Sequence, residues 1–128
     1  MFFSPRPNNL GVRDGRLAPC KPTPNCVCSQ ADPADETHYI EPLRGTIADA
    51  RRVLRNLPRV RIIRDEPNYL YAEFRTRLMR FVDDVELYFD GRVLHVRSCS
   101  RIGRHDLGTN RRRVESLRRL IEGAATSE

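Results

Sequence analysis

The clearest hydrophobic pattern lies near the middle of the chain. Apolar residues recur there at helical spacing: Ile47, Ala50, Val53, Leu54 and Leu57. This spacing predicts an amphipathic helix. Thr46 and Asp49 stand where a capping box would place them, because each side chain can accept a free N–H group of the first turn. Pro58 ends the pattern, since proline lacks the N–H that a helix interior needs.

Four stretches after Pro58 alternate between apolar and polar residues, as half-buried strands do. They span residues 59–65, 69–76, 81–89 and 92–100. A shorter stretch, His38–Glu41, predicts one more strand, which ends at Pro42. Helical spacing returns over residues 110–122, with Gly123 placed to end the helix. The order β-α-β-β-β-β-α predicts an α+β fold, an antiparallel sheet with two helices packed on one face.

The pair Asp90-Gly91 separates the last two predicted strands and favours a two-residue type I′ turn. Such a turn determines which residues of the hairpin face each other. The predicted pairs are Leu87 with Leu94 and Val85 with Val96 on the apolar side, and Glu86 with His95 and Asp84 with Arg97 on the charged side.

The polar face of the predicted sheet gathers seven charged or phenolic side chains. They are Tyr71, Glu73, Arg75, Asp84, Glu86, His95 and Arg97. One interpretation is an open, solvated face with cross-strand ion pairs, and the other is a polar binding surface or a homodimer face. Asp83 breaks the alternation, because it falls on the apolar side opposite Ser98. A carboxylate there needs hydrogen-bond donors, or its pKa will rise.

The segment between residues 100 and 113 is rich in arginine. Three arginines follow Asn110 in the first turn of the predicted helix, where the helix dipole disfavours cations. This pattern indicates a fixed anionic partner. An internal partner could be Asp83, Asp84, Asp106 or Glu115. A bound anion is the alternative, and its predicted ligand-binding residues are Ser100, Arg101, Asn110, Arg111 and Arg113.

Composition divides the chain into three parts. Residues 1–37 show no periodicity and are interpreted as an irregular N-terminal arm, residues 38–123 as the α+β domain, and residues 124–128 as a disordered tail. The net charge of +6 favours an anionic partner. The arginine content, 22 of 23 basic residues, has two interpretations: the codon usage of a GC-rich genome, or bidentate recognition of carboxylate or phosphate. Nucleic acid is disfavoured, because the positive segments flank an acidic middle. With no apolar run of membrane-spanning length and no signal-peptide pattern, a cytoplasmic location is expected.

A set of short motifs resembles one known family. The motifs are Pro19-Cys20, Pro24-Asn25-Cys26-Val27, Tyr71-Ala72-Glu73, Phe81-Val82-Asp83-Asp84-Val85-Glu86, Arg97-Ser98, Ser100-Arg101, Gly103, Asp106, Gly108, Asn110-Arg111 and Arg113-Val114-Glu115. Over about residues 17–122 they are similar to the uncharacterised family catalogued as domain of unknown function 1499. The resemblance implies no established activity. Cys28 and Cys99 stand where relatives usually show Ser and Ala, which suggests that these two cysteines are neighbours able to form a disulfide.

The cysteines themselves do not match a metal site. Cys20, Cys26, Cys28 and Cys99 lack the paired Cys-x-x-Cys spacing of zinc knuckles, so neither a metal nor another cofactor is predicted. Free thiols are expected in a reducing cytosol, whereas in an exported relative a Cys20–Cys26 disulfide could close a loop.

Two functional hypotheses follow. The first is a non-enzymatic module that binds a small anionic ligand or a protein partner through the charged sheet face and the Ser100–Arg113 segment. The second is a metal- or carboxylate-dependent enzyme of unknown reaction, which would use Glu73, Asp84, Glu86 and His95. Arginines beside these carboxylates argue against a divalent metal.

Overall fold

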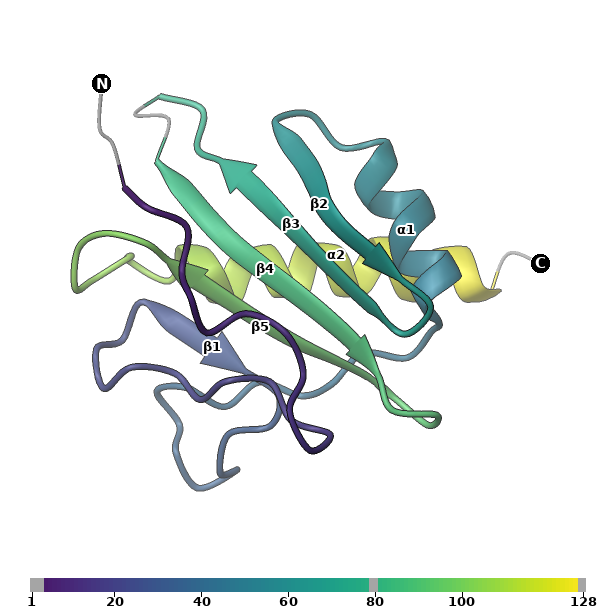
Figure 1. Cartoon of the computed structure of the whole chain (residues 1–128), viewed down its shortest axis with the longest axis horizontal. Coiled ribbons are helices and arrows are strands. Elements are labelled where there is room, and N and C mark those ends of the chain that lie inside the picture. Colours follow the sequence, from purple (N-terminus) through teal and green to yellow (C-terminus); the bar gives the residue numbers. More distant parts are fainter. Residues whose placement is uncertain (1–3, 79–80, 127–128) are drawn as a thin grey trace.

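The computed structural model describes residues 4–78 and 81–126, and in this part of the chain it contains one five-stranded sheet and two helices. The strands are β1 (Cys26–Cys28), β2 (Val60–Glu66), β3 (Tyr69–Arg75), β4 (Val82–Phe89) and β5 (Leu94–Ser100). They are antiparallel to their neighbours and lie in the order β1-β5-β4-β3-β2. The helices are α1 (Ile47–Arg55) and α2 (Thr109–Thr126), as Figure 1 shows. The predicted α+β class and element order are confirmed.

The first strand lies earlier in the chain than the sequence pattern predicts. β1 belongs to the segment interpreted as an irregular arm, and it pairs with β5 at the edge of the sheet. The predicted strand His38–Glu41 is wrong, since within it only Tyr39 forms an isolated bridge, to Cys28. A three-residue strand is too short to reveal an alternating pattern.

The helix boundaries follow their local signals in part. Thr46 and Asp49 form the predicted capping box, in which the Thr46 hydroxyl accepts from the Asp49 N–H and the Asp49 carboxylate accepts from the Thr46 N–H. Gly123 does not end α2, which continues to Thr126. Residues 124–126 of the predicted tail are therefore helical, and residues 127 and 128 lie outside the described residues.

The β4–β5 hairpin has a longer turn than predicted. Phe89 and Leu94 are the last strand pair, and the Asp90 N–H donates to the Val93 carbonyl. The Asp90 carboxylate also accepts from the N–H groups of Arg92 (2.8 Å) and Val93 (2.9 Å). This side chain thus stabilises a four-residue connection relative to the predicted two-residue turn.

The longer turn shifts the register by two residues. Glu86 faces Arg97 instead of His95, Asp84 faces Cys99 instead of Arg97, and Asp83 faces Ser100 instead of Ser98. The predicted pairs are therefore wrong. The predicted faces remain correct, because side chains alternate with a period of two and a shift of two residues preserves the side on which each residue lies.

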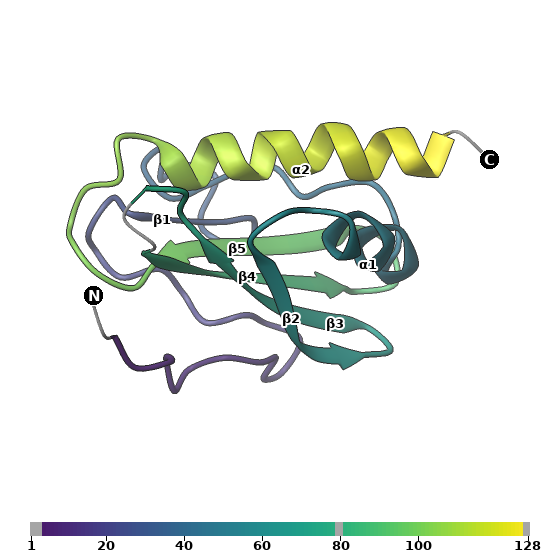
Figure 2. The same ribbon diagram turned by 90° about the horizontal axis from the view of Figure 1, so that it is seen from above.

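Each face of the sheet has its own hydrophobic cluster. On the helix side, Leu87, Leu94 and Val96 pack with Leu54 of α1 and Val114 of α2, and each such buried side chain contributes about 1.5–3 kcal/mol. On the other side, the N-terminal segment runs across the sheet, opposite the helices (Figure 2). Leu10, Val12 and Leu17 of this segment pack there with Tyr69 and Tyr71.

Neither α1 nor α2 combines the length and apolar character of a transmembrane helix, and no other helix of the described residues does.

Candidate functional site

The charged sheet face is buried beneath the N-terminal arm. The carboxylates of Glu73, Asp84 and Glu86 and the guanidinium of Arg97 gather on this face, and each residue is at most 5% exposed. The open, solvated face that the sequence pattern suggested is thus closed by residues of the arm. A carboxylate without water needs protein donors, and each of these acids has them.

Arg101 lies at the centre of one half of this buried network. Its Nε and Nη2 atoms donate to the two carboxylate oxygens of Asp84 at 2.9 Å, and Nη2 also donates to Glu73 and to the Tyr71 hydroxyl at 3.1 Å. The Tyr71 hydroxyl in turn donates to Asp84. The hydrogen bond with Asp84 is the main reason why the pKa of Arg101 rises above its ordinary value. Arg101 therefore lies under the sheet, away from the start of α2 where it was predicted to bind an anion.

Glu86 forms the other half of the network. Its carboxylate is fully buried and accepts from the Tyr69 hydroxyl at 2.6 Å, from the Gly11 N–H at 2.8 Å and from Arg97 Nη1 at 3.3 Å. Gly11 has a φ of +102°, a backbone region that favours glycine. The arm thereby supplies a backbone donor to the interior of the sheet.

Three more contacts attach the arm to the charged residues. Arg6 Nε donates to Glu73 at 2.9 Å, Arg101 Nη1 donates to the Ser4 carbonyl at 3.2 Å, and Arg97 Nη2 donates to the Pro19 carbonyl at 3.3 Å. The arm and the charged face consequently form one structure.

The start of α2 is satisfied by residues of the chain itself. Asp106 accepts from the N–H groups of Gly108 and Asn110, which makes it the residue that caps the helix. Arg113 pairs with Asp83 at 2.7 Å, and Arg111 donates to the Glu36 and Thr37 carbonyls. These contacts form the internal network that was one of the two interpretations of this arginine-rich segment.

Asp83 and Asn110 complete this network on the helix side of the sheet. Burial raises the pKa of Asp83, and the nearby Arg113 opposes that rise only in part. The Asn110 side chain accepts from the Ser98 hydroxyl at 2.7 Å and donates to the Ser100 hydroxyl at 2.8 Å. Asn110 thus acts as an internal linker between α2 and β5.

His95 lies apart from the carboxylates with which the enzyme hypothesis grouped it. Its ring nitrogens contact the Ser29 hydroxyl at 3.0 Å and Asp90 at 3.1 Å, and its strand partner is Tyr88. Glu73 and Asp84 share Arg101 instead. The four residues Glu73, Asp84, Glu86 and His95 therefore do not share one set of hydrogen bonds.

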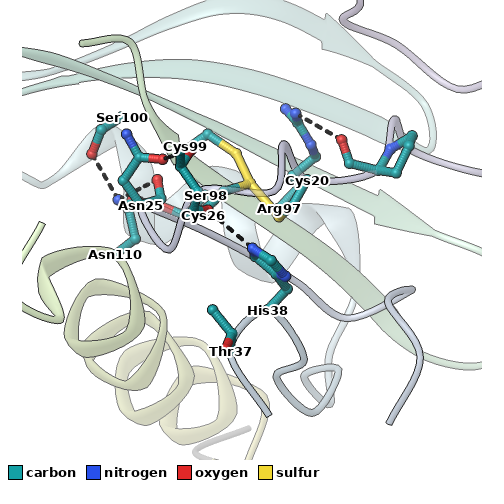
Figure 3. The surroundings of a disulfide bond; sticks show 12 residues. Cys20, Asn25, Cys26, Thr37, His38, Arg97, Ser98, Cys99, Ser100 and Asn110 are labelled. Atoms are coloured by element: carbon teal, nitrogen blue, oxygen red, sulfur yellow. Dashed lines mark hydrogen bonds between the residues drawn. A yellow bond between two sulfur atoms is a disulfide. The ribbon is translucent and has the colours of Figure 1, made fainter. Parts of the chain in front are cut away.

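Three of the four cysteines meet on the arm side of the sheet. The sulfur atoms of Cys20, Cys26 and Cys99 lie within 4.8 Å of one another, and Figure 3 shows their surroundings. Cys26 faces Cys99 across the β1–β5 pair, whereas Cys28 faces Arg97 and is a buried free thiol. The predicted Cys28–Cys99 disulfide is wrong, because the strand pairing gives Cys99 a different partner. No local sequence signal marks β1, so this grouping could not be read from the cysteine spacing.

A pocket of about 250 Å³ lies between the arm and the ends of β4 and β5. It is lined by Ser4, Pro5, Pro7, Asn9 and Lys21 of the arm and by Asp84, Arg97, Cys99, Ser100 and Arg101. It therefore joins Ser100 and Arg101 of the predicted ligand-binding set to Asp84 and Arg97 of the predicted charged face. Asn110, Arg111 and Arg113 do not line it.

Two residues that line this pocket each have a buried polar atom without a hydrogen-bond partner among the described residues. The two atoms are Arg97 Nε, a donor, and Asn9 Oδ1, an acceptor. Buried polar atoms of this kind are rare in folded proteins, and each one calls for an explanation. Both residues line the pocket, although the two atoms themselves are shielded from solvent.

Comparison with known proteins gives a family but no activity. No curated protein and no solved structure matches this chain. The family described as "Protein of unknown function (DUF1499)" matches residues 16–121, a span that begins within the arm and includes the whole sheet, α1 and most of α2. The chain that builds this buried charge network and this three-cysteine cluster is therefore a member of the DUF1499 family.

Proposed function

We propose that this protein is a non-enzymatic binding module that holds a small oxyanion in the pocket beneath the N-terminal arm. The observation that carries the proposal is Arg97 Nε. The Arg97 side chain is 4% exposed, and its other nitrogens donate to Glu86 and to the Pro19 carbonyl. A buried donor without a partner costs about 1–3 kcal/mol, so an acceptor that comes within hydrogen-bond distance of Nε removes this cost.

The charge of the pocket supports an anionic ligand. The half-exposed Arg6 and the buried Arg97 and Arg101 are balanced by three carboxylates, those of Glu73, Asp84 and Glu86. Lys21 lines the same pocket and adds one more positive charge. An anion therefore meets a net positive site, where it can accept charge-assisted hydrogen bonds.

The unpartnered Asn9 oxygen narrows the ligand class. It needs a donor, so the ligand carries a hydroxyl group in addition to its charged oxygens. Hydrogen phosphate and small hydroxycarboxylates meet both conditions and are small enough for a pocket of about 250 Å³. A protein partner is less well supported, because the arm already covers the charged face on which such a partner would dock.

Thermal unfolding at constant ionic strength tests this proposal, with sodium phosphate compared against sodium sulfate. Both anions stabilise proteins non-specifically, but only hydrogen phosphate can donate to Asn9. We expect phosphate to raise the melting temperature more than sulfate does. We also expect Lys21→Met to raise the dissociation constant for phosphate about tenfold. This corresponds to the loss of one charge-assisted contact of about 1.4 kcal/mol.

Arg92→Met is the matched control, because Arg92 is exposed at the β4–β5 turn, far from the pocket lining. It should retain the response of the unmodified protein. Equal effects of phosphate and sulfate, or an unchanged phosphate response in Lys21→Met, would overturn the proposal.

A further inference from the structure

Cys26 stands between two possible disulfide partners. Its sulfur atom lies within 4.8 Å of the sulfur atoms of both Cys20 and Cys99, and Cys99 is its strand partner on β5. Figure 3 shows the three residues together. A sulfur atom can form only one disulfide, so the two bonds are alternatives and each leaves one free thiol in place.

We infer that Cys20, Cys26 and Cys99 form a thiol–disulfide relay, in which a single disulfide moves between Cys20–Cys26 and Cys26–Cys99. In the forward step the Cys99 thiolate attacks Sγ of Cys26. The Cys26–Cys99 bond forms, the Cys20–Cys26 bond breaks, and Cys20 leaves as a thiolate. Cys20 then takes up one proton, equal to the proton that Cys99 released. The step is an isomerisation and needs no external oxidant or reductant.

The backbone favours Cys20–Cys26 as the resting disulfide. Its Cα atoms are 5.7 Å apart, within the usual range of about 4.4–6.8 Å. The Cα atoms of Cys26 and Cys99 are 4.1 Å apart, the close approach of a cross-strand pair without hydrogen bonds between its residues. In the resting form Cys99 is therefore the free thiol, held next to the disulfide by the sheet.

Basic residues lie near Cys20 and Cys99, the two alternative partners of Cys26. A nearby cation stabilises a thiolate, which is the form of cysteine that attacks or leaves. Cys99 shares its pocket with Lys21, Arg97 and Arg101. Cys20 lines a second pocket, of about 260 Å³, together with the basic residues His38 and Arg16 and the acidic residues Asp32 and Asp35.

The hydrogen bonds of His38 favour its protonated form. One ring nitrogen contacts the Asp35 carboxylate at 2.7 Å and the other contacts the Thr23 carbonyl at 3.0 Å. Both partners are acceptors, so these contacts favour a proton on each ring nitrogen. Burial works against the charge, but these two contacts outweigh burial and raise the pKa of His38.

Cys28 does not take part in the relay. It is 2% exposed and lies outside the group of three sulfur atoms. Burial raises the pKa of its thiol, which suppresses the nucleophilic thiolate. Cys28→Ser is consequently the matched control for the three relay cysteines.

The relay determines where the protein presents a thiol. With Cys20–Cys26 bonded, the thiol of Cys99 faces the pocket beneath the arm. With Cys26–Cys99 bonded, the thiol of Cys20 faces the pocket that contains His38. This inference stands independently of the oxyanion proposal, because it depends on sulfur positions and makes no use of a bound ligand.

Disulfide mapping of the full-length, folded protein tests the relay. The protein is oxidised to one disulfide, quenched with acid, alkylated with N-ethylmaleimide and digested with trypsin. Cleavage after Arg16, Arg44, Arg97 and Arg101 places Cys99 in peptide 98–101 and the other cysteines in peptide 17–44, since Pro22 prevents cleavage after Lys21. The Cys20–Cys26 disulfide then lies within one peptide, whereas Cys26–Cys99 joins two peptides.

We expect both forms in the unmodified protein and in Cys28→Ser, at the same ratio. Cys99→Ser should leave only the Cys20–Cys26 disulfide, which lies within one peptide. Cys20→Ser should leave only the Cys26–Cys99 disulfide, which joins two peptides. Iodoacetamide added to the folded, oxidised protein should modify Cys20 and Cys99 to a sum of one thiol per chain. A single disulfide form in the unmodified protein would overturn the relay. The relay would also be overturned if the three thiols resisted oxidation and retained a bound soft metal ion, because that result identifies a metal site.

Discussion

Glu73 illustrates how one buried carboxylate couples stability to pH. Burial alone would raise its pKa, but the hydrogen bonds from Arg101 and Arg6 outweigh burial and hold the pKa below the ordinary value of 4.5. A carboxyl group with a lowered pKa in the folded state contributes stability above its ordinary pKa. This contribution is lost as the pH falls through the lower, folded value.

We therefore expect the free energy of unfolding to decrease as the pH falls from about 4.5, and to decrease less steeply in Glu73→Gln. Arg6→Gln should also reduce the slope, because it removes one of the contacts that lower the pKa of Glu73. Urea titrations between pH 3 and pH 6 measure the slope. Identical slopes in Glu73→Gln and the unmodified protein would show that this network does not hold the Glu73 charge.

Single substitutions among the buried acids and bases should have large effects on stability. Glu86 and Arg97 are at most 4% exposed, and removal of one member of such a pair leaves an uncompensated charge, at a cost of about 3–5 kcal/mol. The exposed pair of Arg64 and Glu66 belongs to the class whose members contribute about 0–1 kcal/mol. The two ion pairs contain the same residue types, and the difference in their burial determines how much each contributes to stability.

The β4–β5 hairpin shows at the scale of elements how a side chain determines a turn. Asp90 accepts from two backbone N–H groups of the connection. These hydrogen bonds form in the four-residue turn that begins at Asp90. The charged pairing of Glu86 with Arg97 agrees with this register and with the position of Gly11 over Glu86.

Asp90→Ala should lower the free energy of unfolding by about 1–2 kcal/mol, because two N–H groups lose their acceptor. Asp90→Asn retains an acceptor oxygen and should recover most of this loss. Chemical denaturation measures both variants. If alanine and asparagine were equally destabilising, the charge of Asp90 and its contact with His95 would carry the effect, and the backbone hydrogen bonds would not determine the turn.

At the scale of the whole molecule, the sheet has two layers that cover it. The helices protect one face, and residues of the N-terminal arm protect the other (Figure 2). The arm has no regular structure over residues 4–12, so its position depends on its contacts with the sheet. Those contacts are the charged network and the cluster around Tyr69 and Tyr71.

Removal of residues 1–14 should destabilise the domain strongly. It takes away the Gly11 donor and the Arg6 partner, and it exposes the apolar surface that Leu10 and Val12 cover. We expect a loss of about 3–5 kcal/mol and a smaller urea m-value, since less surface is buried. Equal stability and an equal m-value in the shortened protein would show that the arm lies on the sheet without contributing to its stability.

Much of this molecule follows from local pattern, because periodicity and capping act over a few residues. Thr46 and Asp49 indicate the start of α1, and alternation assigns Leu70, Leu87 and Val96 to the core side without knowledge of the partner strand. Even with the register wrong by two residues, each side chain of the hairpin was assigned to its correct face.

Only the tertiary structure decided what covers the charged face of the sheet, opposite the helices. Cys20 and Cys99 meet, Gly11 reaches Glu86, and Arg101 lies under the sheet because segments distant in sequence are brought together, and no periodicity records such contacts. The same polar pattern of Glu73, Asp84 and Glu86 is compatible with a wet surface and with a buried network. The choice between them depends on whether other parts of the chain supply enough donors to replace water.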